Sequence, residues 1–465
     1  MPLIELKDFN LGGLADSAYQ GLAGSLYRIV GMDLHSEPGV MKVNQALVKE
    51  SGSTIDDFVK TIVPCSDGNT YLFGATSGKI WKRTSGGSYS LEATASPAAG
   101  NAGILWAEEF NGYIYYAMQS RLGRVAVGSP TSWAGRNDSW ATFTVTDDTY
   151  HPMIIKNLEL WIADGYLLAQ VDDGGTFTAN ALDLETQYRI SSIGETAYEL
   201  ILGTYIGANV RKVKTFRYNT WSSSWSSEDV MPEIDVSAFL DVDNFTVACA
   251  GRKGNIYSYN GSQFEAVKRI PGDWSSTNRA IVHGGAHENF DIPLFGLSND
   301  NNNPALQGVY SYGSYSANYP RILNLEYVIS QNKTSSIEIG AIKSVGDNML
   351  VSWKDGSTYG VDKIDWSNKL NGAYVETRVI TLERSKQKTF KVNIGYRTLP
   401  GSTDITLQVS VNGAAYAAQT LTTDATRNLK FTELQLPEAN TIQFKIITSS
   451  NGNNAPEIEN VEISY

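Results

Sequence analysis

The chain has 465 residues, of which 42% are apolar and 18% are charged, with a formal net charge of −12 at pH 7. This composition is typical of a folded chain with enough apolar residues for more than one domain. The negative charge argues against binding nucleic acid without regard to sequence, since such binding depends on Lys and Arg neutralising phosphates. The 42 glycines, 25 tyrosines and 14 prolines favour strands joined by tight turns. We therefore expect an all-β protein.

The chain shows no signal for export or for a membrane span. It contains no run of about 18 apolar residues, and its N-terminus lacks a basic stretch followed by an apolar one. The two cysteines, Cys65 and Cys249, lie far apart, each beside residues that alternate as in a strand. Such a pair provides no disulfide framework, so both are predicted to be buried thiols of a protein that folds in the cytosol.

The N-terminal residues divide into two parts. Residues 1–38 hold glycines, small residues and scattered Leu and Tyr without a sustained period, which predicts an N-terminal arm. This arm either folds back on its own chain or packs on a neighbouring molecule. Residues 39–52, with the sequence GVMKVNQALVKESG, begin like a strand. We expect this strand to close a ring by completing the last repeat, at residues 348–364.

The central part of the chain repeats one pattern at intervals of roughly 40 to 60 residues. Each repeat has an apolar strand, a turn rich in Gly, Ser, Asn or Asp, and a second strand with alternating aromatic or aliphatic residues. The repeats begin near Thr70, Gly112, Leu158, Tyr198, Phe245, Asp291 and Asn348. This spacing is typical of four-stranded propeller blades, so residues 39–370 are predicted to form a β-propeller. Seven blades is the natural count, with six or eight as alternatives.

The pattern changes near residue 371. Residues 371–465 alternate apolar and polar residues in short strands, which are separated by the turn sequences LPGST, VNGAA and SSNGNNAP. About seven or eight short strands of this kind predict a C-terminal β-sandwich.

Candidate chemistry is sparse. VDDGGTFT (171–178) and WKDGSTYG (353–360) come close to the Asp-box of propeller glycosidases, but both depart from its pattern and are read as structural turns. HGGAHE (283–288) has metal-ligand residue types, yet its central glycines favour a loop with solvated histidines. Several carboxylates near strand ends could form a hydrolytic pair, although Asp is also a common turn residue: Asp164, Asp172, Asp173, Asp241, Asp243 and Asp347. We predict no catalytic residue, no metal, no cofactor and no enzymatic activity.

Paired tryptophans mark a candidate contact surface. Trp133 and Trp140 lie in SPTSWAGRNDSW, and Trp221 and Trp225 lie in YNTWSSSWSS, both rich in Ser and Asn. Trp in a polar loop offers a large rigid area with a polar atom, as contact surfaces and sugar-binding sites use it. The alternative is that these side chains pack between blades.

The sequence also resembles a known family. Residues 150–205, the stretch GNIYSYNGSQFEAVKRIPG and the N-terminal stretch FNLGGLADSAYQGLAGSLYRIVGMDLHSEPGVMKVNQAL resemble β-propeller virion proteins of tailed bacteriophages. The resemblance covers most of the first 370 residues and implies a structural component of the tail or the head-to-tail region, or an attachment surface. Implied partners are other virion proteins and further copies of the chain, within a virion assembled in the host cytoplasm. The alternatives are a carbohydrate-binding host-attachment module and, after it, a propeller glycosidase.

Overall fold

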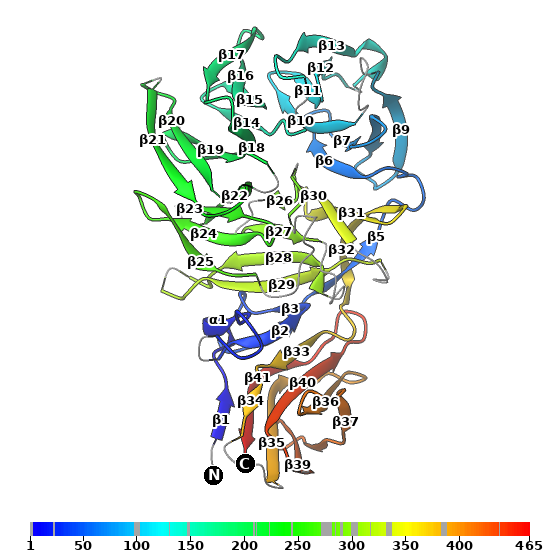
Figure 1. Cartoon of the computed structure of the whole chain (residues 1–465). Helices are drawn as coiled ribbons and strands as arrows, with labels where there is room; N and C mark the ends of the chain where they lie inside the picture. Colours follow the sequence, from blue (N-terminus) through cyan, green and yellow to red (C-terminus); the bar gives the residue numbers. More distant parts are fainter. Residues whose placement is uncertain are drawn as a thin grey trace. The chain divides into compact units, whose positions relative to one another are not determined.

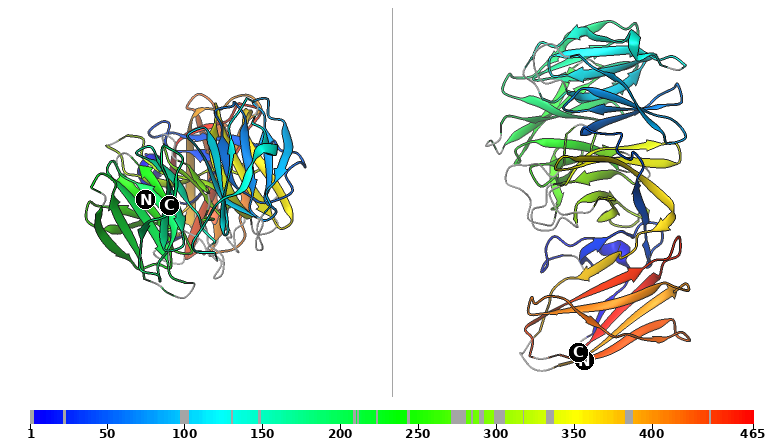
Figure 2. Two further views of the ribbon diagram at one scale, coloured as in Figure 1. Left: turned by 90° about the horizontal axis from the view of Figure 1, so that it is seen from above. Right: turned by 90° about the vertical axis from the view of Figure 1, so that its right-hand side faces the viewer.

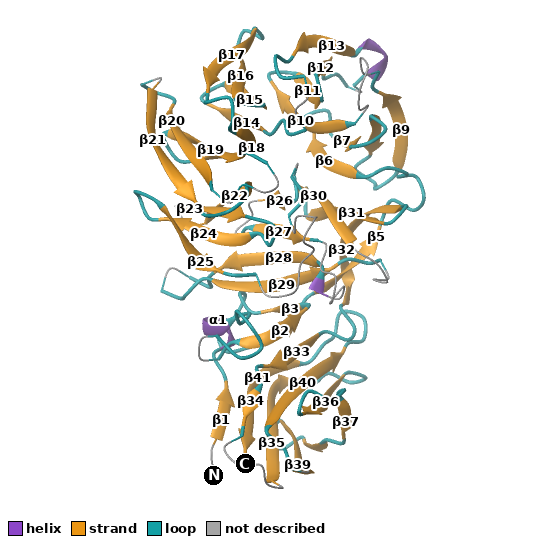
Figure 3. Cartoon of the chain, in the orientation of Figure 1, coloured by secondary structure: helices purple, strands orange, loops and turns teal. Residues whose placement is uncertain are grey.

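The structure of the chain is a computed structural model. It describes residues 3–21, 24–96, 103–129, 131–146, 149–207, 210, 212–222, 224–242, 245–270, 281–283, 285–288, 292–298, 306–316, 318–331, 337–382, 388–436 and 438–465. These residues are mainly strands and turns, with a four-residue helix α1 (Phe9–Gly12) and a 3-10 turn (Trp133–Gly135) (Figure 3). The prediction of an all-β protein is confirmed.

Seven sheets in the described part of the chain have four strands each (Figure 1). The first sheet consists of β6 (Val59–Pro64), β7 (Thr70–Gly74), β8 (Lys79–Arg83) and β9 (Tyr89–Thr94), and the second of β10 (Ile104–Phe110), β11 (Tyr113–Met118), β12 (Arg121–Ala126) and β13 (Asn137–Thr142). The third consists of β14 (Met153–Lys156), β15 (Glu159–Asp164), β16 (Leu167–Val171) and β17 (Phe177–Asp183), and the fourth of β18 (Arg189–Glu195), β19 (Glu199–Tyr205), β20 (Val213–Asn219) and β21 (Ser224–Met231). The other three are β22 (Val236–Val242), β23 (Phe245–Ala250), β24 (Asn255–Tyr259) and β25 (Phe264–Lys268); β26 (His287–Glu288), β27 (Leu294–Leu297), β28 (Gly308–Gly313) and β29 (Ile322–Val328); β30 (Ile337–Val345), β31 (Asn348–Asp355), β32 (Thr358–Lys369) and β5 (Gln45–Lys49).

The last of these sheets takes its fourth strand from the N-terminal part of the chain. Its order is β30-β31-β32-β5, and the backbone amide of Glu50 donates to the carbonyl of Val361 at 2.9 Å just beyond β5. The prediction that residues 39–52 complete the repeat at 348–364 is confirmed.

The first strands of the seven sheets form a closed ring. They contact one another in the order β6, β10, β14, β18, β22, β26, β30 and again β6. Neighbouring sheets pack face to face, as where Tyr71 and Phe73 of β7 join Tyr116 of β11 and Trp133 in one buried cluster. A lone four-stranded sheet has two apolar faces to bury, and stacking the sheets around an axis buries both. The chain is therefore a β-propeller with larger sheets attached to it in sequence.

A bulge recurs where the first two strands of a sheet pair. The pairing shifts register at Val59/Thr61, Ile104/Trp106, Ile190/Ser192, Val236/Ala238 and Ile339/Ile342. A bulge adds a residue to one strand and increases the local twist. We therefore expect a stronger twist between the first two strands of these five sheets.

Two larger sheets combine N-terminal and C-terminal strands. One has seven strands in the order β3-β4-β41-β35-β39-β38, with β1 also on β41; the other has six in the order β2-β33-β40-β36-β37, with β34 also on β40. Their strands are β1 (Leu3–Leu6), β2 (Leu26–Val30), β3 (Met32–Asp33), β4 (Met41–Val43), β33 (Tyr374–Thr377), β34 (Ile380–Thr381), β35 (Lys388–Thr398), β36 (Asp404–Val411), β37 (Ala417–Gln419), β38 (Thr422–Asp424), β39 (Leu429–Leu436), β40 (Thr441–Ser449) and β41 (Glu457–Ser464). Leu3 pairs with Ser464, so the two ends of the chain lie side by side (Figure 2).

The N-terminal residues are thus part of sheets that they share with the C-terminal strands. The chain forms two compact units, one of Met1–Val48, Gly308–Ser330 and Ile364–Tyr465, the other of Lys49–Gln307 and Gln331–Lys363. These units are discontinuous in sequence. The predicted domains, 1–38, 39–370 and 371–465, follow sequence order and stay predictions.

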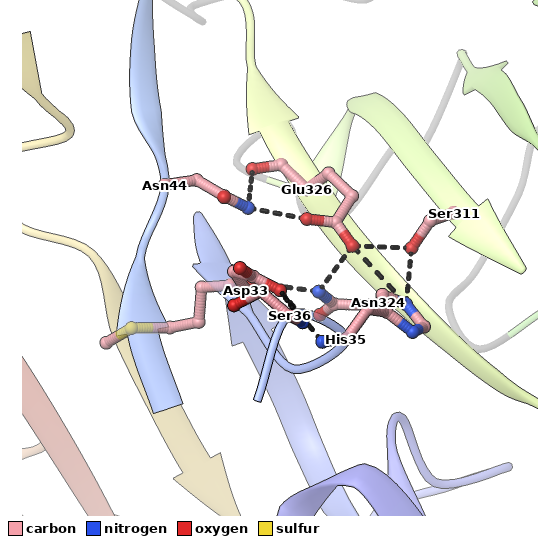
Figure 4. A network of polar contacts seen from close by, with 8 residues as sticks. Asp33, His35, Ser36, Asn44, Ser311, Asn324 and Glu326 are labelled. Carbon is pink, nitrogen blue, oxygen red and sulfur yellow. Dashed lines mark hydrogen bonds and ion pairs between the residues drawn. The ribbon is translucent and has the colours of Figure 1, made fainter. Parts of the chain in front are cut away.

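A buried polar network joins the N-terminal residues to β28 and β29 within the first unit (Figure 4). The carboxylate of Glu326 accepts hydrogen bonds from Ser311 Oγ at 2.6 Å, Asn324 Nδ2 at 3.0 Å and Asn44 Nδ2 at 2.5 Å. His35 Nε2 lies 2.9 Å from Ser311 Oγ and 3.4 Å from Glu326 Oε1. All five residues are buried. The network fixes the N-terminal residues because a buried carboxyl is costly unless its oxygens are bonded.

Both cysteines are free. Cys249 is buried, as predicted. Cys65 is only half-buried, which corrects the prediction for this residue, because it follows the last residue of β6 and its amide closes a turn to Asn69.

Candidate binding surface

The four predicted tryptophans lie in three different environments. Trp133 is 3% exposed and packs with its ring centroid 5.2 Å from that of Tyr71 and 6.1 Å from that of Tyr116. No face of this indole is open to a ligand, so Trp133 does not belong to a contact surface. Trp140 is half-buried, and its ring centroid lies 5.3 Å from that of Tyr115. The Arg124 guanidinium lies 4.2 Å from the centroid of the Trp140 ring.

The other two tryptophans are on the fourth strand and the preceding turn of one sheet. Trp225 on β21 is 42% exposed and packs at 5.4 Å on Tyr218. Trp221, in the turn between β20 and β21, is 75% exposed, and its amide donates to Asn219 Oδ1 at 3.0 Å. For Trp140, Trp221 and Trp225 a role in contacts stays a prediction.

Trp221 has exposed apolar neighbours that sequence reasoning missed. Leu158, in the turn between β14 and β15, is 71% exposed, and Tyr198, in the turn between β18 and β19, is 65% exposed. Hydrogen bonds join the three turns: Asn157 Nδ2 donates to Thr220 Oγ1 at 2.8 Å, and the Thr220 amide donates to the Tyr198 carbonyl at 3.3 Å. We call Leu158, Tyr198 and Trp221 the apolar patch.

The turn that carries Leu158 is strained. Asn157 has φ of 55° and Leu158 has φ of 63°. A two-residue hairpin turn with both residues in the left-handed region is the type I′ turn, which favours Asn followed by Gly. Leu at the second position has a Cβ that this backbone disfavours, at about 1–2 kcal/mol. Strain kept in an exposed turn is typical of functional positions. In the sequence, the signal for this position was an apolar residue, Leu158, where a two-residue turn favours Gly.

A groove of about 860 Å³ adjoins the patch. It lies among the strand ends of the sheets β14–β17, β18–β21 and β22–β25, and Ala197 and Glu199, which flank Tyr198, line it. The other lining residues are Lys156, Glu195, Thr196, Arg217, Asp241, Thr246, Tyr259, Asn260 and Gly261. We call this the polar groove.

Buried cations organise the polar groove. The side chain of Lys156 is 7% exposed, and its Nζ donates to Glu195 Oε2 at 2.9 Å and to the Thr196 carbonyl at 2.7 Å. A buried ammonium requires such partners because losing its hydration is costly. Lys156 therefore holds Glu195 at the wall of the groove.

Arg217 forms the second fixed cation. Its guanidinium lies 4.5 Å from the ring centre of Tyr259, donates to the Tyr259 hydroxyl, and is 3.9 Å from carboxylates of Glu199 and Asp229. Its Nε is buried and has no hydrogen-bond partner among the residues that the structure describes. The groove thus presents fixed charges of both signs beside an aromatic ring, which suits hydrogen-bonding ligands such as sugars or polar side chains.

Of the other carboxylates that the sequence singled out, Asp241 lines the polar groove, while Asp164 and Asp172 bind backbone amides. Asp164 is 0% exposed and accepts hydrogen bonds from the amides of Thr144 at 2.7 Å and Val145 at 3.1 Å. Asp172 accepts from the Thr176 amide at 2.7 Å inside the turn between β16 and β17. Asp243 lies outside the described residues.

The histidines of HGGAHE are not both solvated, which corrects that prediction. His283 is 6% exposed, with Nε2 3.5 Å from Asp235 Oδ2 and its ring 4.4 Å from that of Tyr150. His287 lies on β26 and is half-buried. His283 is buried because it packs against Tyr150 and Asp235, which precede β14 and β22 in the chain.

Comparisons with known proteins show similarity of fold only. No protein-family profile matches the chain, and no curated protein matches it. Among solved structures, a streptogramin B lyase is 12% identical, with a TM-score of 0.49, covering 69% of this chain and 98% of its own. The Dos1 propeller is 11% identical, with a TM-score of 0.46, and the match covers 70% of this chain and 95% of the Dos1 chain. An exo-β-1,3-galactanase from Phanerochaete chrysosporium is 13% identical, with a TM-score of 0.30, covering 97% and 100%.

Among the described residues, no helix has the length and apolarity to span a membrane.

Proposed function

We propose that the protein is a non-enzymatic structural component of a tailed-phage virion, in the tail or head-to-tail region, that acts through protein–protein contacts. The sequence resemblance supports the class of particle. Its partners in this proposal are other virion proteins and further copies of the chain, in a virion assembled in the host cytoplasm.

The proposal includes a fold of seven blades followed by a β-sandwich. The closed contact order of the seven first strands supports the count. Phe390 of β35 and Phe444 of β40 belong to the two different large sheets, and their ring centres lie 6.3 Å apart. Aromatic packing between facing sheets supports a sandwich.

The apolar patch is the observation that carries an assembly role. Its three side chains are 65% to 75% exposed and lie in turns fixed by mutual hydrogen bonds. Full burial of one such side chain contributes about 1.5–3 kcal/mol, so a partner that covers the patch gains several such contributions. Exposed aromatic residues beside a polar rim are the usual composition of a protein contact site.

Self-association can be measured by sedimentation velocity over a range of protein concentrations. We expect the wild-type protein to associate with rising concentration and Trp221→Ala to weaken the association roughly 5–30-fold in Kd. Trp366→Ala is the matched control, because Trp366 is 55% exposed on β32, away from these turns in sequence. A wild-type protein that stays monomeric throughout, or equal effects of both variants, would contradict assembly through the patch.

The polar groove favours carbohydrate attachment as a second candidate function. Glu195, Asp241 and Asn260 line the groove and offer groups that bind sugar hydroxyls. Saturation-transfer NMR against host surface glycans tests it. Loss of the signal in Asn260→Ala, with the signal kept in Trp366→Ala, would support attachment in place of assembly.

A further inference from the structure

A second cavity lies among the first strands of the propeller, within the second compact unit. It has a volume of about 230 Å³ and is lined by β6, β10, β26, β30 and the residue Gly285 before β26. Its lining residues are Thr61, Ile62, Trp106, Ala107, Glu108, Gly285, His287, Glu288, Ala341, Ile342 and Lys343. We call it the axial cavity. It exceeds the space of one bare ion, since one water occupies roughly 30 Å³.

The charges in the axial cavity do not balance. Lys343 Nζ lies 3.1 Å from Glu288 Oε2, and this pair neutralises itself. The charges of Lys343 and Glu288 both act on the Glu108 carboxyl, yet Glu108 forms no salt bridge within the described part of the chain. Burial and Lys343 lower the pKa of His287 to about 4, so its imidazole is neutral at pH 7. An ionised Glu108 therefore leaves one uncompensated negative charge.

The pKa of Glu108 is set mainly by burial. Burial raises the pKa of the Glu108 carboxyl to about 7; Lys343 opposes the rise, and Glu288 and Glu109 add to it. The titratable groups around it are Glu109 on its own strand, His287 and Glu288 on β26, and Lys343 on β30, while β6 contributes Thr61 and Ile62. A ligand that brings a positive charge would favour the ionised carboxylate.

The rest of the lining distinguishes the kind of cation. Trp106 is one of the residues that line the cavity, and aromatic faces attract alkylammonium groups. The described residues contain no group of three or more His, Cys, Asp or Glu side chains placed to hold a metal ion. We propose that the axial cavity binds a small organic cation, an alkylammonium ion, between the Glu108 carboxylate and the Trp106 indole.

This inference is independent of the proposed function, because its residues take no part in the apolar patch or the polar groove. A positive result for one therefore leaves the other open. The ligand is defined by one positive charge, methyl or methylene groups for the indole, and a size that fits about 230 Å³.

The test is isothermal titration calorimetry with tetramethylammonium and methylammonium chloride, against sodium chloride at equal ionic strength. For a carboxyl with a pKa of about 7, the ionised fraction rises about tenfold between pH 6 and pH 8. We expect the Kd to be about tenfold lower at pH 8 than at pH 6. Glu108→Gln is expected to abolish both the binding and its pH dependence.

Two further variants keep the outcome decisive. Glu338→Gln is the matched control, since Glu338 is also on β30 but pairs with Lys354 at 3.2 Å and does not line the cavity. Trp106→Leu keeps the carboxylate and removes the aromatic wall, so tetramethylammonium should bind less tightly. Thermal melting checks that each variant is folded. Absence of saturable binding to the wild-type protein, or unchanged binding by folded Glu108→Gln, would overturn the proposal.

Discussion

Replacing Leu158 separates the stability of its turn from the contact that we assign to it. Leu158 has φ of 63° and is 71% exposed, so its side chain contributes little to the folded monomer. Leu158→Gly and Leu158→Ala both remove the apolar side chain. Only Gly also removes the Cβ that the left-handed backbone disfavours.

The expected difference between the two variants follows from two opposing terms. Relief of the left-handed conformation is worth about 1–2 kcal/mol. The larger conformational entropy of Gly in the unfolded chain offsets about 0.5–1 kcal/mol of this gain. At the midpoints of these two ranges, Leu158→Gly should therefore be more stable than Leu158→Ala by about 0.75 kcal/mol, the reverse of the usual order at an ordinary position.

Urea denaturation followed by circular dichroism measures the difference in stability, and sedimentation velocity measures association in the same samples. Both variants should lose association, since both lack the apolar side chain. A Leu158→Ala protein that is as stable as Leu158→Gly would refute the account of strain. Association that survives in both variants would refute the place of Leu158 in the contact.

Three further predictions concern stability. Trp133→Ala should lose about 3–5 kcal/mol of unfolding free energy by chemical denaturation, because the indole is enclosed. Asp164→Ala should lose about 1–3 kcal/mol, since it leaves the amides of Thr144 and Val145 without their acceptor. Burial raises the pKa of Glu326, so the folded state holds this proton more tightly than the unfolded state. The wild-type protein should therefore lose stability as pH rises from the pKa of Glu326 in the unfolded state through its pKa in the folded state. Glu326→Gln should remove this pH dependence in a series of thermal melts across that range. An unchanged pH dependence would show that Glu326 is not its source.

The repeat pattern predicted the propeller because each sheet is built from neighbouring strands. The apolar first strands and the Gly-rich turns are local features, and they report local pairing directly. Closure by residues 39–52 was also predictable, since a ring needs a last strand and this segment alternates like one. The strands of residues 3–43 were not predicted as partners of the C-terminal sheets, because their pairing is entirely non-local and their pattern is short.

The sites were harder to predict than the fold. Sequence reasoning selected tryptophans by type, and Trp133 is enclosed whereas Trp221 is exposed. Composition alone cannot separate the two, because both lie in stretches rich in Ser and Asn. Exposure depends on which turn faces solvent. The axial cavity could not be predicted from the sequence either, because Glu108 and Lys343, which line it, belong to strands far apart in sequence.

The topology of the N-terminal residues decides how assembly should be tested. Deleting the first 38 residues would remove β1, β2 and β3, which pair with β41, β33 and β4. The deletion would leave unpaired edges on both large sheets, and unpaired edges promote association of their own. A change in mass after truncation would then report the exposed edges as well as any lost contact. Point substitutions at Leu158 and Trp221, with Trp366→Ala as control, leave every strand pair in place and are therefore the cleaner test.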